Sequence, residues 1–573
     1  MPGGPTRRDV IAGAVALGAA ACAGRKVVMR KTSSGMVATT QWPATDAGLE
    51  ILRAGGTAAD AAIAAAAALA VTEPMMTGLG GDCFALHYAA ATGKITALNG
   101  SGRSPAALTL DAVSSRGFTQ IPDTGGLPVT VPGACAGWAD LIAAHGKLSL
   151  ARVLEPAIRL AEEGFAVGKK IAFAWERGAD RLLAAPGKGW ALLVEGRAPV
   201  AGEHFKNPAL ARALREVARG GKDAFYQGPI ADAIVRTVKE SGGVMELADL
   251  AAHASTWVEP ISTTYRGRRI WECPPNGQGL VPLLALNILE GYDLHAMVPL
   301  GPQRLHLVAE ALRLAFADAR WFIGDPEHAA IPVAELLAKS YAARRRALID
   351  PARAQQQIVH GEPRGRSDTT YLCAVDADGN ACSFINSNFD LFGSGLVPGA
   401  SDRELGWGFA LQDRGASFVL EPGHPDMVGP RKRPYHTIIP GMITHPDGSL
   451  YGPFGVMGGF MQPQGHVQVV TALLDDNLAP QTALDQPRLC VHARDGGAVW
   501  PSDASAVDLL LEHGIAAETA GALAAMGHTV KPDIDGPRRL VFGRGQIIRV
   551  ERDGTLAGGS DLRGDGYAGS TDR

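Results

Sequence analysis

The sequence lacks the cysteine and histidine spacings that hold metal-bound or disulfide-rich folds together. None of its seven cysteines forms a CxxC pair: Cys22, Cys83, Cys135, Cys273, Cys373, Cys382 and Cys490. This spacing argues against a zinc site and a dense disulfide framework, so we expect buried free thiols. The fifteen histidines contain no HExxH or HxxEH motif. A metal-dependent hydrolase is therefore disfavoured, and we predict neither a metal nor another cofactor.

An excess of positive charge is also missing. The chain has 54 Lys and Arg against 58 Asp and Glu, which gives a formal net charge of -4 and a pI near 6.4. Nucleic-acid binding therefore has no electrostatic support. Hydrophobic residues make up 46% of the 573 positions. A substantial core is thus expected, and the length allows more than one domain.

Apolar runs long enough to span a membrane are lacking as well. Near the N-terminus, "TRRDVIAGAVALGAAACAG" places Arg7-Arg8 before a weakly apolar run and several small residues. The run is too short to span a bilayer comfortably. This layout predicts an export signal of the twin-arginine type over residues 1–24, and hence a periplasmic or secreted protein. A disordered N-terminus on a cytoplasmic protein is the alternative.

Helical and strand patterns alternate along the rest of the chain. Residues 44–74 predict two helices, the first ending at Gly55-Gly56 and the second rich in alanine and suited to close packing. Residues 135–350 read as mostly helical. Short strands dominate from residue 368, and 504–527 predict a last helix. This mixture indicates an α/β or α+β architecture.

A hairpin is predicted between "TTYLCAVD" and "ACSFINSN", because Asp378-Gly379 is a strong turn signal. A two-residue turn would place Thr369 opposite Asn388, and a four-residue loop would place it opposite Asn386. In either register the Thr369 hydroxyl lies close to Asn386, Ser387 and Asn388. The plainer alternative is that threonine merely begins a strand.

A glycine pair marks a second region of interest. Gly458-Gly459 follows a predicted strand and precedes a predicted helix, where backbone N–H groups can point at a shared oxyanion position. Glycine pairs also serve ordinary turns. Upstream, the basic segment "RKRPYHTIIPGMITHPDG" leads into an apolar strand with His436-Thr437 at its start.

Taken together, these blocks resemble the γ-glutamyltransferase family of N-terminal-nucleophile hydrolases. The resemblance rests on "SDTTYLCAVDADGNACSF", "KRPYHTIIP", "GVMGGFMQPQGH" and "GGSDLRGDGYA", in that order, and on the N-terminal helices. It implies an α+β fold, a four-layer αββα sandwich formed by two chains cut from one precursor. The large subunit would span 25–368, helix-rich with N-terminal strands, and the small subunit 369–573.

The resemblance also implies a mechanism. The chain would cut itself between Asp368 and Thr369, and the new N-terminal Thr369 would use its own α-amine as the base. Gly458 and Gly459 match the oxyanion-hole positions, and Ser387 matches the hydroxyl that bonds the nucleophile. The expected partners are a small-molecule amide or γ-glutamyl substrate and the two subunits of the precursor.

Substrate binding is assigned by the same resemblance. Arg103, in "NGSGRSP", matches an arginine that grips a substrate carboxylate. Without that context, Arg103 would read as a solvated loop charge. His436-Thr437 stands where the family has a carboxylate-binding serine pair. Asn388 is a possible substitute for an asparagine expected at Phe389.

One departure bears on the substrate. Ser417, with Arg414 three residues before it, stands where glutathione-cleaving enzymes carry an aspartate for the substrate ammonium. Such features resemble a side branch that includes oxamate amidohydrolases and cephalosporin-acylase-like proteins. We therefore expect an amide whose carboxylate is held by Arg103 and Arg414, with no α-amino group required. Alternatively, Arg414 forms a surface ion pair with Asp413 or Glu421.

Three functions remain open at this point. The leading one is a self-processing amidohydrolase or acyltransferase that works through an acyl-enzyme on Thr369. A conventional γ-glutamyltransferase or glutathione hydrolase is the second, because Arg103, Thr369 and the glycine pair are retained. A non-processing exported protein that binds small carboxylates is the third.

Overall fold

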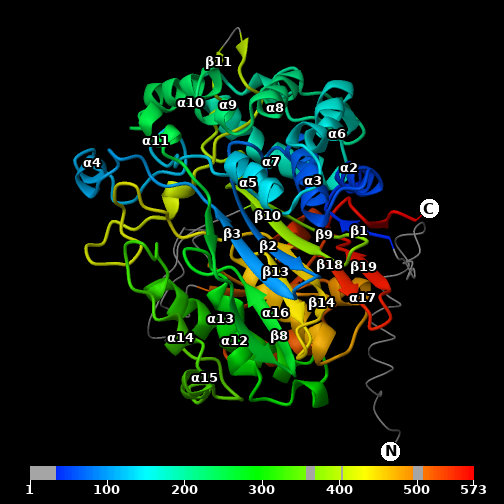
Figure 1. Ribbon diagram of the computed structural model, residues 1–573. Helices are drawn as coiled ribbons and strands as arrows, with labels where there is room; N and C mark the ends of the chain where they lie inside the picture. The colour runs from blue at the N-terminus through cyan, green and yellow to red at the C-terminus, as the bar shows by residue number, and fades with distance from the viewer. Residues whose placement is uncertain (1–33, 357–367, 402–403, 494–506, 573) are drawn as a thin grey trace, which may run out of the picture.

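The computed structural model describes residues 34–356, 368–401, 404–493 and 507–572. Two β-sheets are stacked in the middle of the molecule, and helices cover their outer faces (Figure 1). The predicted four-layer αββα arrangement is confirmed. The predicted export signal lies outside the described residues.

The first sheet contains seven strands drawn from the whole length of the chain. Their order is β20 (Ala568–Ser570), β1 (Met36–Ala38), β9 (Asp368–Val375), β10 (Ala381–Phe389), β2 (Asp82–Ala89), β3 (Lys94–Gly100) and β6 (Thr256–Val258). All their pairings are antiparallel. β9 and β10 thus lie near the centre of this sheet, with neighbours on both sides.

The second sheet has six antiparallel strands. Their order is β19 (Leu556–Ser560), β18 (Arg544–Val550), β14 (Leu450–Met457), β13 (Gly441–Thr444), β8 (Arg268–Glu272) and β7 (Ile261–Tyr265). β9 contacts β14 across the space between the sheets. The Tyr371 ring fills the space beside Gly455, where an added Cβ would come within 2.6 Å of the ring. Glycine at 455 therefore lets the sheets approach closely.

Helices form the two outer layers. Those on the side of the first sheet are α2 (Trp42–Arg53), α3 (Ala58–Thr72), α5 (Ala134–His145), α6 (Leu150–Glu163), α7 (Lys169–Ala184), α8 (Pro208–Gly220), α9 (Asp223–Tyr226), α10 (Pro229–Glu240) and α11 (Leu247–Ala251), with α4 (Leu110–Ser114) at the edge (Figure 1). Those on the side of the second sheet are α12 (Leu280–Leu289), α13 (Pro302–Phe322), α14 (Val333–Leu336), α15 (Lys339–Arg346), α16 (Met461–Leu474) and α17 (Pro480–Asp485).

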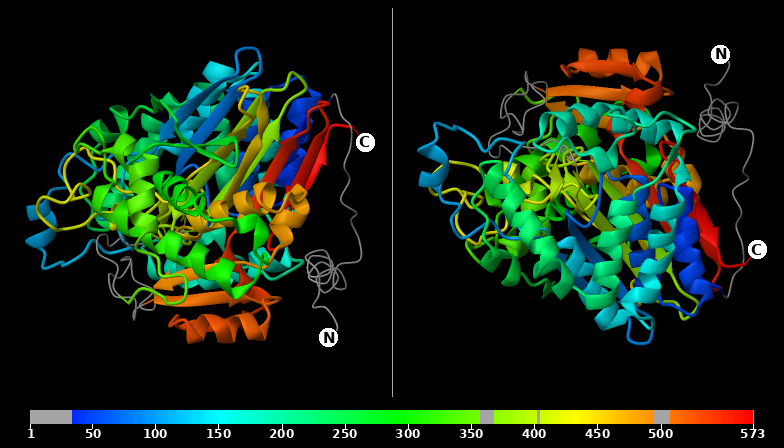
Figure 2. Two further views of the ribbon diagram at one scale, coloured as in Figure 1. Left: turned by 90° about the horizontal axis from the view of Figure 1, so that it is seen from below. Right: turned by 90° about the horizontal axis from the view of Figure 1, so that it is seen from above.

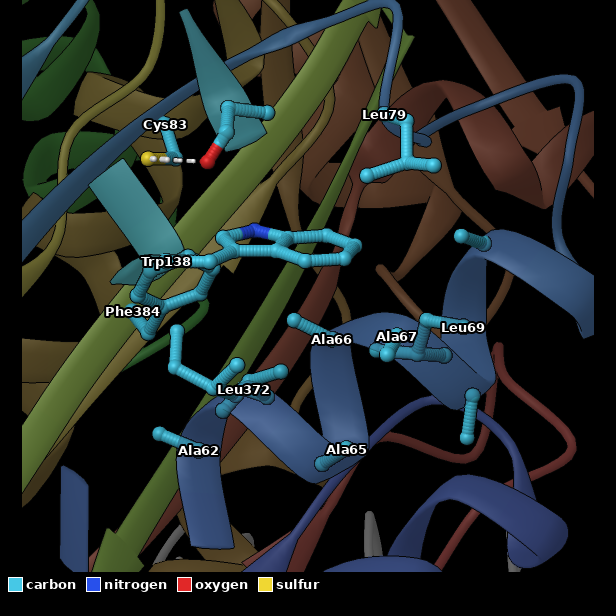
Figure 3. Packing of buried hydrophobic residues seen from close by; sticks show 14 of the residues in the cluster. Ala62, Ala65, Ala66, Ala67, Leu69, Leu79, Cys83, Trp138, Leu372 and Phe384 are labelled. Carbon is cyan, nitrogen blue, oxygen red and sulfur yellow. Dashed lines mark hydrogen bonds between the residues drawn. The ribbon is translucent and has the colours of Figure 1, made fainter. Parts of the chain in front are cut away.

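Helix α3 explains the alanine-rich run. Every one of its residues is buried, and a capping box between Thr57 and Asp60 fixes its start. Its small side chains let it pack closely on β9 and β10, where Ala62 and Ala66 lie near Leu372 and Trp138 (Figure 3). The expectation of close packing is confirmed.

A small lobe projects from one side of the molecule (Figure 2). It consists of β15 (Leu489–Ala493), β16 (Val507–Glu512), β17 (Val530–Ile534) and α18 (Ala517–Ala525). The prediction of a continuous helix over 504–527 is wrong in its first half. β16 is a short apolar run, and periodicity alone does not separate such a run from a buried helix.

The helical reading of 135–350 also missed strands. β6, β7 and β8 lie within it, as do β4 (Phe165–Ala166) and β5 (His204–Phe205), which pair with each other. Outside this range, β11 (Ala400–Ser401) and β12 (Glu404–Leu405) form another short antiparallel pair. β8 pairs with β13, and β7 pairs with β8 and forms the edge of the second sheet. The mixed polarity of these two short strands gives no clear alternation that would predict them from the sequence.

The cysteines and the lengths of the helices test two further expectations. The six cysteines among the described residues are buried and form no disulfide, as predicted. Within the same residues, no helix is both long and apolar enough to cross a membrane.

Candidate active site

The β9–β10 hairpin places Thr369 beside Ser387. The strands pair from Val375 with Ala381 to Thr370 with Asn386, and then shift so that Asp368 faces Phe389. Thr369 therefore lies opposite a bulge formed by Ser387 and Asn388. Its hydroxyl donates to the Ser387 hydroxyl at 3.1 Å, and its side chain is fully buried.

Both predicted registers of this hairpin are off by one residue. The Asp376 N–H donates to the Asn380 carbonyl at 3.0 Å, so the connecting loop has three residues, Ala377 to Gly379. Gly379 adopts φ +83°, a left-handed conformation typical of such three-residue loops. The expected proximity of Thr369 to the polar end of β10 is nevertheless confirmed.

Ser387 connects the threonine to a buried arginine. Besides Thr369, its hydroxyl oxygen accepts the Phe389 N–H at 2.9 Å and Nη2 of Arg414 at 3.2 Å. Nη1 of Arg414 donates to the Thr437 hydroxyl at 2.9 Å. A line of contacts thus runs from Thr369 through Ser387 to a guanidinium and a second threonine.

Arg414 is an unusual buried cation. It begins the 3-10 turn Arg414–Ser417, is fully buried, and lies with Cζ 4.3 Å from the centroid of the Phe389 ring. Within the described parts of the chain it forms no ion pair, and its Nε has no hydrogen-bond partner. Burial lowers its pKa to about 10, partly offset by Asp82 and Asp413, so it stays charged at neutral pH. The alternative of a surface ion pair is wrong.

The carboxylates that influence Arg414 have other partners. Asp82 accepts from the ring of His436 at 2.9 Å and from two backbone N–H groups. Asp413 binds Arg181 and the Asp390 N–H. Burial raises the pKa of Asp413 to about 6 against the effect of Arg181. The positive charge of Arg414 is therefore offset only at a distance.

The glycine pair lies between β14 and α16. Gly458 and Gly459 have φ of +124° and +58°, conformations that favour glycine. Gly458 O accepts from the Met461 N–H, so the Gly459 N–H, across the same planar peptide, points away from the helix. Among the described residues, neither glycine N–H has a hydrogen-bond partner. Two backbone donors are thus available, as an oxyanion hole requires.

Gln462, on the first turn of α16, was missed by the sequence interpretation. Its Nε2 donates to the Thr369 hydroxyl oxygen at 3.3 Å, while its Oε1 accepts the Ile439 N–H at 3.0 Å. It follows the glycine pair by three residues within the quoted "GVMGGFMQPQGH" motif. Its position directly after two candidate donors was the signal that could have identified it.

Three residues assigned to substrate binding have other contacts here. Both oxygens of Glu327 accept from Nη2 of Arg103, at 2.6 and 2.8 Å, in a partly exposed pair. Asn388 donates through Nδ2 to the Pro74 carbonyl at 3.1 Å. His436 is fully buried against Asp82 and stacks on Phe84 at 5.6 Å. Of the assigned set, Arg414 contacts Ser387 directly, and Thr437 is linked to Ser387 through Arg414.

The strand expected to start at His436-Thr437 begins later. β13 starts at Gly441, and His436 forms an isolated bridge with Gly277. The prolines at 434 and 440 flank this segment and interrupt regular pairing. His436 and Thr437 are therefore held by specific side-chain contacts within a buried loop.

Two stacked sheets with helices on their outer faces form the αββα architecture of N-terminal-nucleophile hydrolases. In this chain a buried threonine, Thr369, lies on a central strand of that architecture. The chain belongs to the γ-glutamyltranspeptidase family, whose model matches residues 44–571. It is an enzyme of the amidohydrolase and acyltransferase type. The family and fold indicated by the sequence motifs are confirmed.

Several relatives cover nearly the whole chain. The glutathione hydrolase-like YwrD proenzyme of Bacillus subtilis (strain 168) is 37% identical over 93% of this chain and 98% of its own. The oxamate amidohydrolase proenzyme of Klebsiella pneumoniae is 33% identical over 94% of this chain and 98% of its own. The crystal structure of cephalosporin acylase from Bacillus halodurans has a TM-score of 0.86 and 42% sequence identity, and the match covers 96% of this chain and 98% of the acylase chain.

Proposed function

We propose that the chain cuts itself between Asp368 and Thr369. The Thr369 hydroxyl attacks the Asp368 carbonyl, the peptide nitrogen leaves, and water hydrolyses the resulting ester. The products are a chain ending at Asp368 and a second chain, 369–573, with a free α-amine on Thr369. The burial of the Thr369 hydroxyl between Ser387 and Gln462 supports this step, and related chains are named proenzymes.

The same threonine then performs acyl transfer on a substrate amide. Its α-amine, with a pKa near 8, takes the hydroxyl proton, and the oxygen attacks the amide carbonyl. The Gly458 and Gly459 N–H groups stabilise the oxyanion, and the amine leaves with a proton. Water or an acceptor amine then releases the acyl group. Ser387 and Gln462 hold the nucleophile through its oxygen.

The substrate carries a carboxylate near the scissile amide, and Arg414 binds it. The observation that carries this proposal is a fully buried guanidinium, without an ion pair in the described structure, one hydroxyl away from Thr369. A buried unpaired charge is costly, and a bidentate carboxylate would satisfy it. Thr437 and, after separation from Glu327, Arg103 complete the carboxylate site. His436 and Asn388 line its surroundings.

A free α-amino group on the substrate is not required. The position expected to bind ammonium is Ser417, whose hydroxyl donates to the Arg414 and Tyr435 carbonyls. The carboxylates Asp82 and Asp413 are already engaged, and Arg414 would repel a second cation. Conventional glutathione hydrolysis remains the second candidate, because Thr369, Arg103 and the glycine pair are retained.

We also propose that residues 1–24 direct export through the twin-arginine route, as the Arg7-Arg8 pair indicates. The mature enzyme would then consist of chains 25–368 and 369–573 in the periplasm or outside the cell. Mass spectrometry of the purified protein would locate the mature N-terminus and the internal cut together. A mature protein that retains residue 1 and is found in the cytoplasmic fraction would contradict the export signal.

A matched pair of substrates tests the substrate class. Glutaryl-p-nitroanilide and γ-glutamyl-p-nitroanilide differ only in the α-amino group. We expect kcat/KM for the glutaryl compound to equal or exceed that for the γ-glutamyl compound. A preference of about 100-fold or more for the γ-glutamyl compound, roughly 2.7 kcal/mol of transition-state binding, would show that the ammonium is recognised after all.

A further inference from the structure

A cluster of two histidines and a glutamate lies apart from the residues that contact Thr369. His306 and Glu310 are one turn apart on α13 and fully buried, and His528 follows the end of α18. One ligand atom from each of the three lies within 4.8 Å of the others. Nδ1 of His306 is 2.8 Å from Nε2 of His528.

The contacts around His306 orient it as a ligand. Its Nε2 lies 2.8 Å from the Asp350 carbonyl oxygen, an acceptor, so Nε2 carries the proton. Nδ1 is then left with a lone pair that faces His528. A backbone carbonyl that fixes the far nitrogen of a metal-binding imidazole is a common feature of metal centres.

Glu310 is fixed in a similar way. Its carboxylate accepts from Nη1 of Arg313 and from the Gln355 N–H at 3.1 Å, and each oxygen keeps a lone pair. A cavity adjoins the cluster, lined by residues that include Arg313, Gln355 and His528. Of the three candidate ligands, His528 lines this cavity, which leaves space on its side of the cluster for a further small ligand.

We propose that His306, Glu310 and His528 bind a divalent transition-metal ion of the Zn²⁺ class. Two imidazoles and one carboxylate suit such an ion, and the fourth position would face the cavity. Tetrahedral ligands about 2.1 Å from zinc lie roughly 3.4 Å apart. The two histidine nitrogens, now 2.8 Å apart, must therefore separate by about 0.6 Å. The proton on Nε2 of His528 shifts to Nδ1, which frees Nε2 to bind.

This site would join the two parts of the chain. His306 and Glu310 precede residue 368, whereas His528 follows it. The segment that carries Asp350 and Gln355 also packs here, with the Ala354 N–H donating to the Met526 carbonyl at 2.7 Å. A bound ion would therefore fasten the small lobe to α13.

The test uses tag-free full-length protein, stripped with a chelator and titrated with Zn²⁺ by calorimetry. Co²⁺ serves as a spectroscopic probe, because a tetrahedral site gives intense visible absorption. We expect one Zn²⁺ per protein and a raised melting temperature. His306→Gln and His528→Gln should each weaken binding by at least about tenfold.

His513→Gln is the matched control. His513 belongs to the same lobe but is exposed and contacts Asp533 instead. It should bind Zn²⁺ like the wild type, with circular dichroism confirming that every variant is folded. The proposal is overturned if the wild type shows no saturable Zn²⁺ binding, or if His306→Gln and His528→Gln bind as tightly as the control.

Discussion

Cζ of Arg414 lies 4.3 Å from the ring centroid of Phe389, directly beside the bulge that faces Thr369. The resemblance to γ-glutamyltransferases placed an asparagine at 389. The aromatic ring instead stacks on the guanidinium and favours its charged form, a contact usually about 0.5–2 kcal/mol in strength. This departure from the family pattern therefore supports the buried cation.

Phe389→Asn should weaken carboxylate binding without unfolding the protein. Phe389 has φ +78°, a conformation that asparagine tolerates well. We expect KM for glutaryl-p-nitroanilide to rise between about 2-fold and 30-fold, with a smaller effect on kcat. An unchanged KM in a folded variant would mean that the stacking does not support substrate binding.

Arg414→Lys should be more damaging than its preserved charge suggests. Lysine cannot reach Ser387 and Thr437 together, because it lacks the planar fork of donors. We expect kcat/KM for the glutaryl substrate to fall at least about 100-fold. Arg103→Lys is the control and should cost less, since Arg103 is paired with Glu327 and partly exposed. Equal losses in both variants would contradict the assignment of Arg414 as the principal carboxylate ligand.

Thr369→Ala should remain a single uncut chain on a denaturing gel and show no acyl transfer. Alanine keeps the strand but removes the only atom proposed to attack the Asp368 carbonyl. Thr370→Ala is the neighbouring control, because Thr370 donates to Glu73 rather than to the site. We expect it to be cut. Two bands from purified Thr369→Ala would refute self-cleavage by this hydroxyl.

Gln462→Glu should lower kcat more than KM. Glutamate keeps the Oε1 that accepts the Ile439 N–H but loses the donor to Thr369. Loss of one oriented donor predicts a decrease in kcat of roughly tenfold, about 1.4 kcal/mol. Gln468→Glu, farther along α16, serves as the control. A variant with wild-type kcat would show that Gln462 is only a structural contact.

His87 should make the protein sensitive to acid. Burial and the neighbouring His145 lower its pKa from 6.5 to about 3. Between these values the unfolded chain binds a proton that the folded chain does not, so stability falls as pH falls. The contribution approaches about 1.4 kcal/mol per pH unit.

His87→Phe removes this titration while keeping a ring beside His145, which stacks on His87 at 3.8 Å. We expect the melting temperature of the variant to fall less than that of the wild type between pH 7 and pH 5. The Thr369→Ala background keeps one continuous chain for the comparison. Parallel decreases in both proteins would indicate that other groups dominate the acid response.

Local patterns were sufficient for some parts of the fold and site. The ends of α2 and α3 follow from Gly55-Gly56 and Glu73-Pro74, and the Asp378-Gly379 turn gave the hairpin. The hairpin register was off by one because a three-residue loop and a two-residue loop share the same turn signal. Thr369 still fell among the same polar residues.

Contacts between distant segments could not be read from spacing. Gln462 reaches Thr369 because β14 stacks on β9, and Arg103 meets Glu327 over 224 positions. His306, Glu310 and His528 match no compact metal-binding motif for the same reason, because His528 lies far from the other two in the sequence. Such pairings are set by the packing of the layers, which local periodicity does not encode.

The strand order of the first sheet determines how the segments on either side of the proposed cut must fold. β20, β9 and β10 come from one side of the Asp368–Thr369 bond, and β1, β2, β3 and β6 come from the other. The proposed cut would therefore separate two polypeptides that already share one sheet, and the backbone link would become dispensable only after folding. Halves synthesised separately would each expose unpaired strand edges, so we expect the two segments to fold together only as one uncut chain.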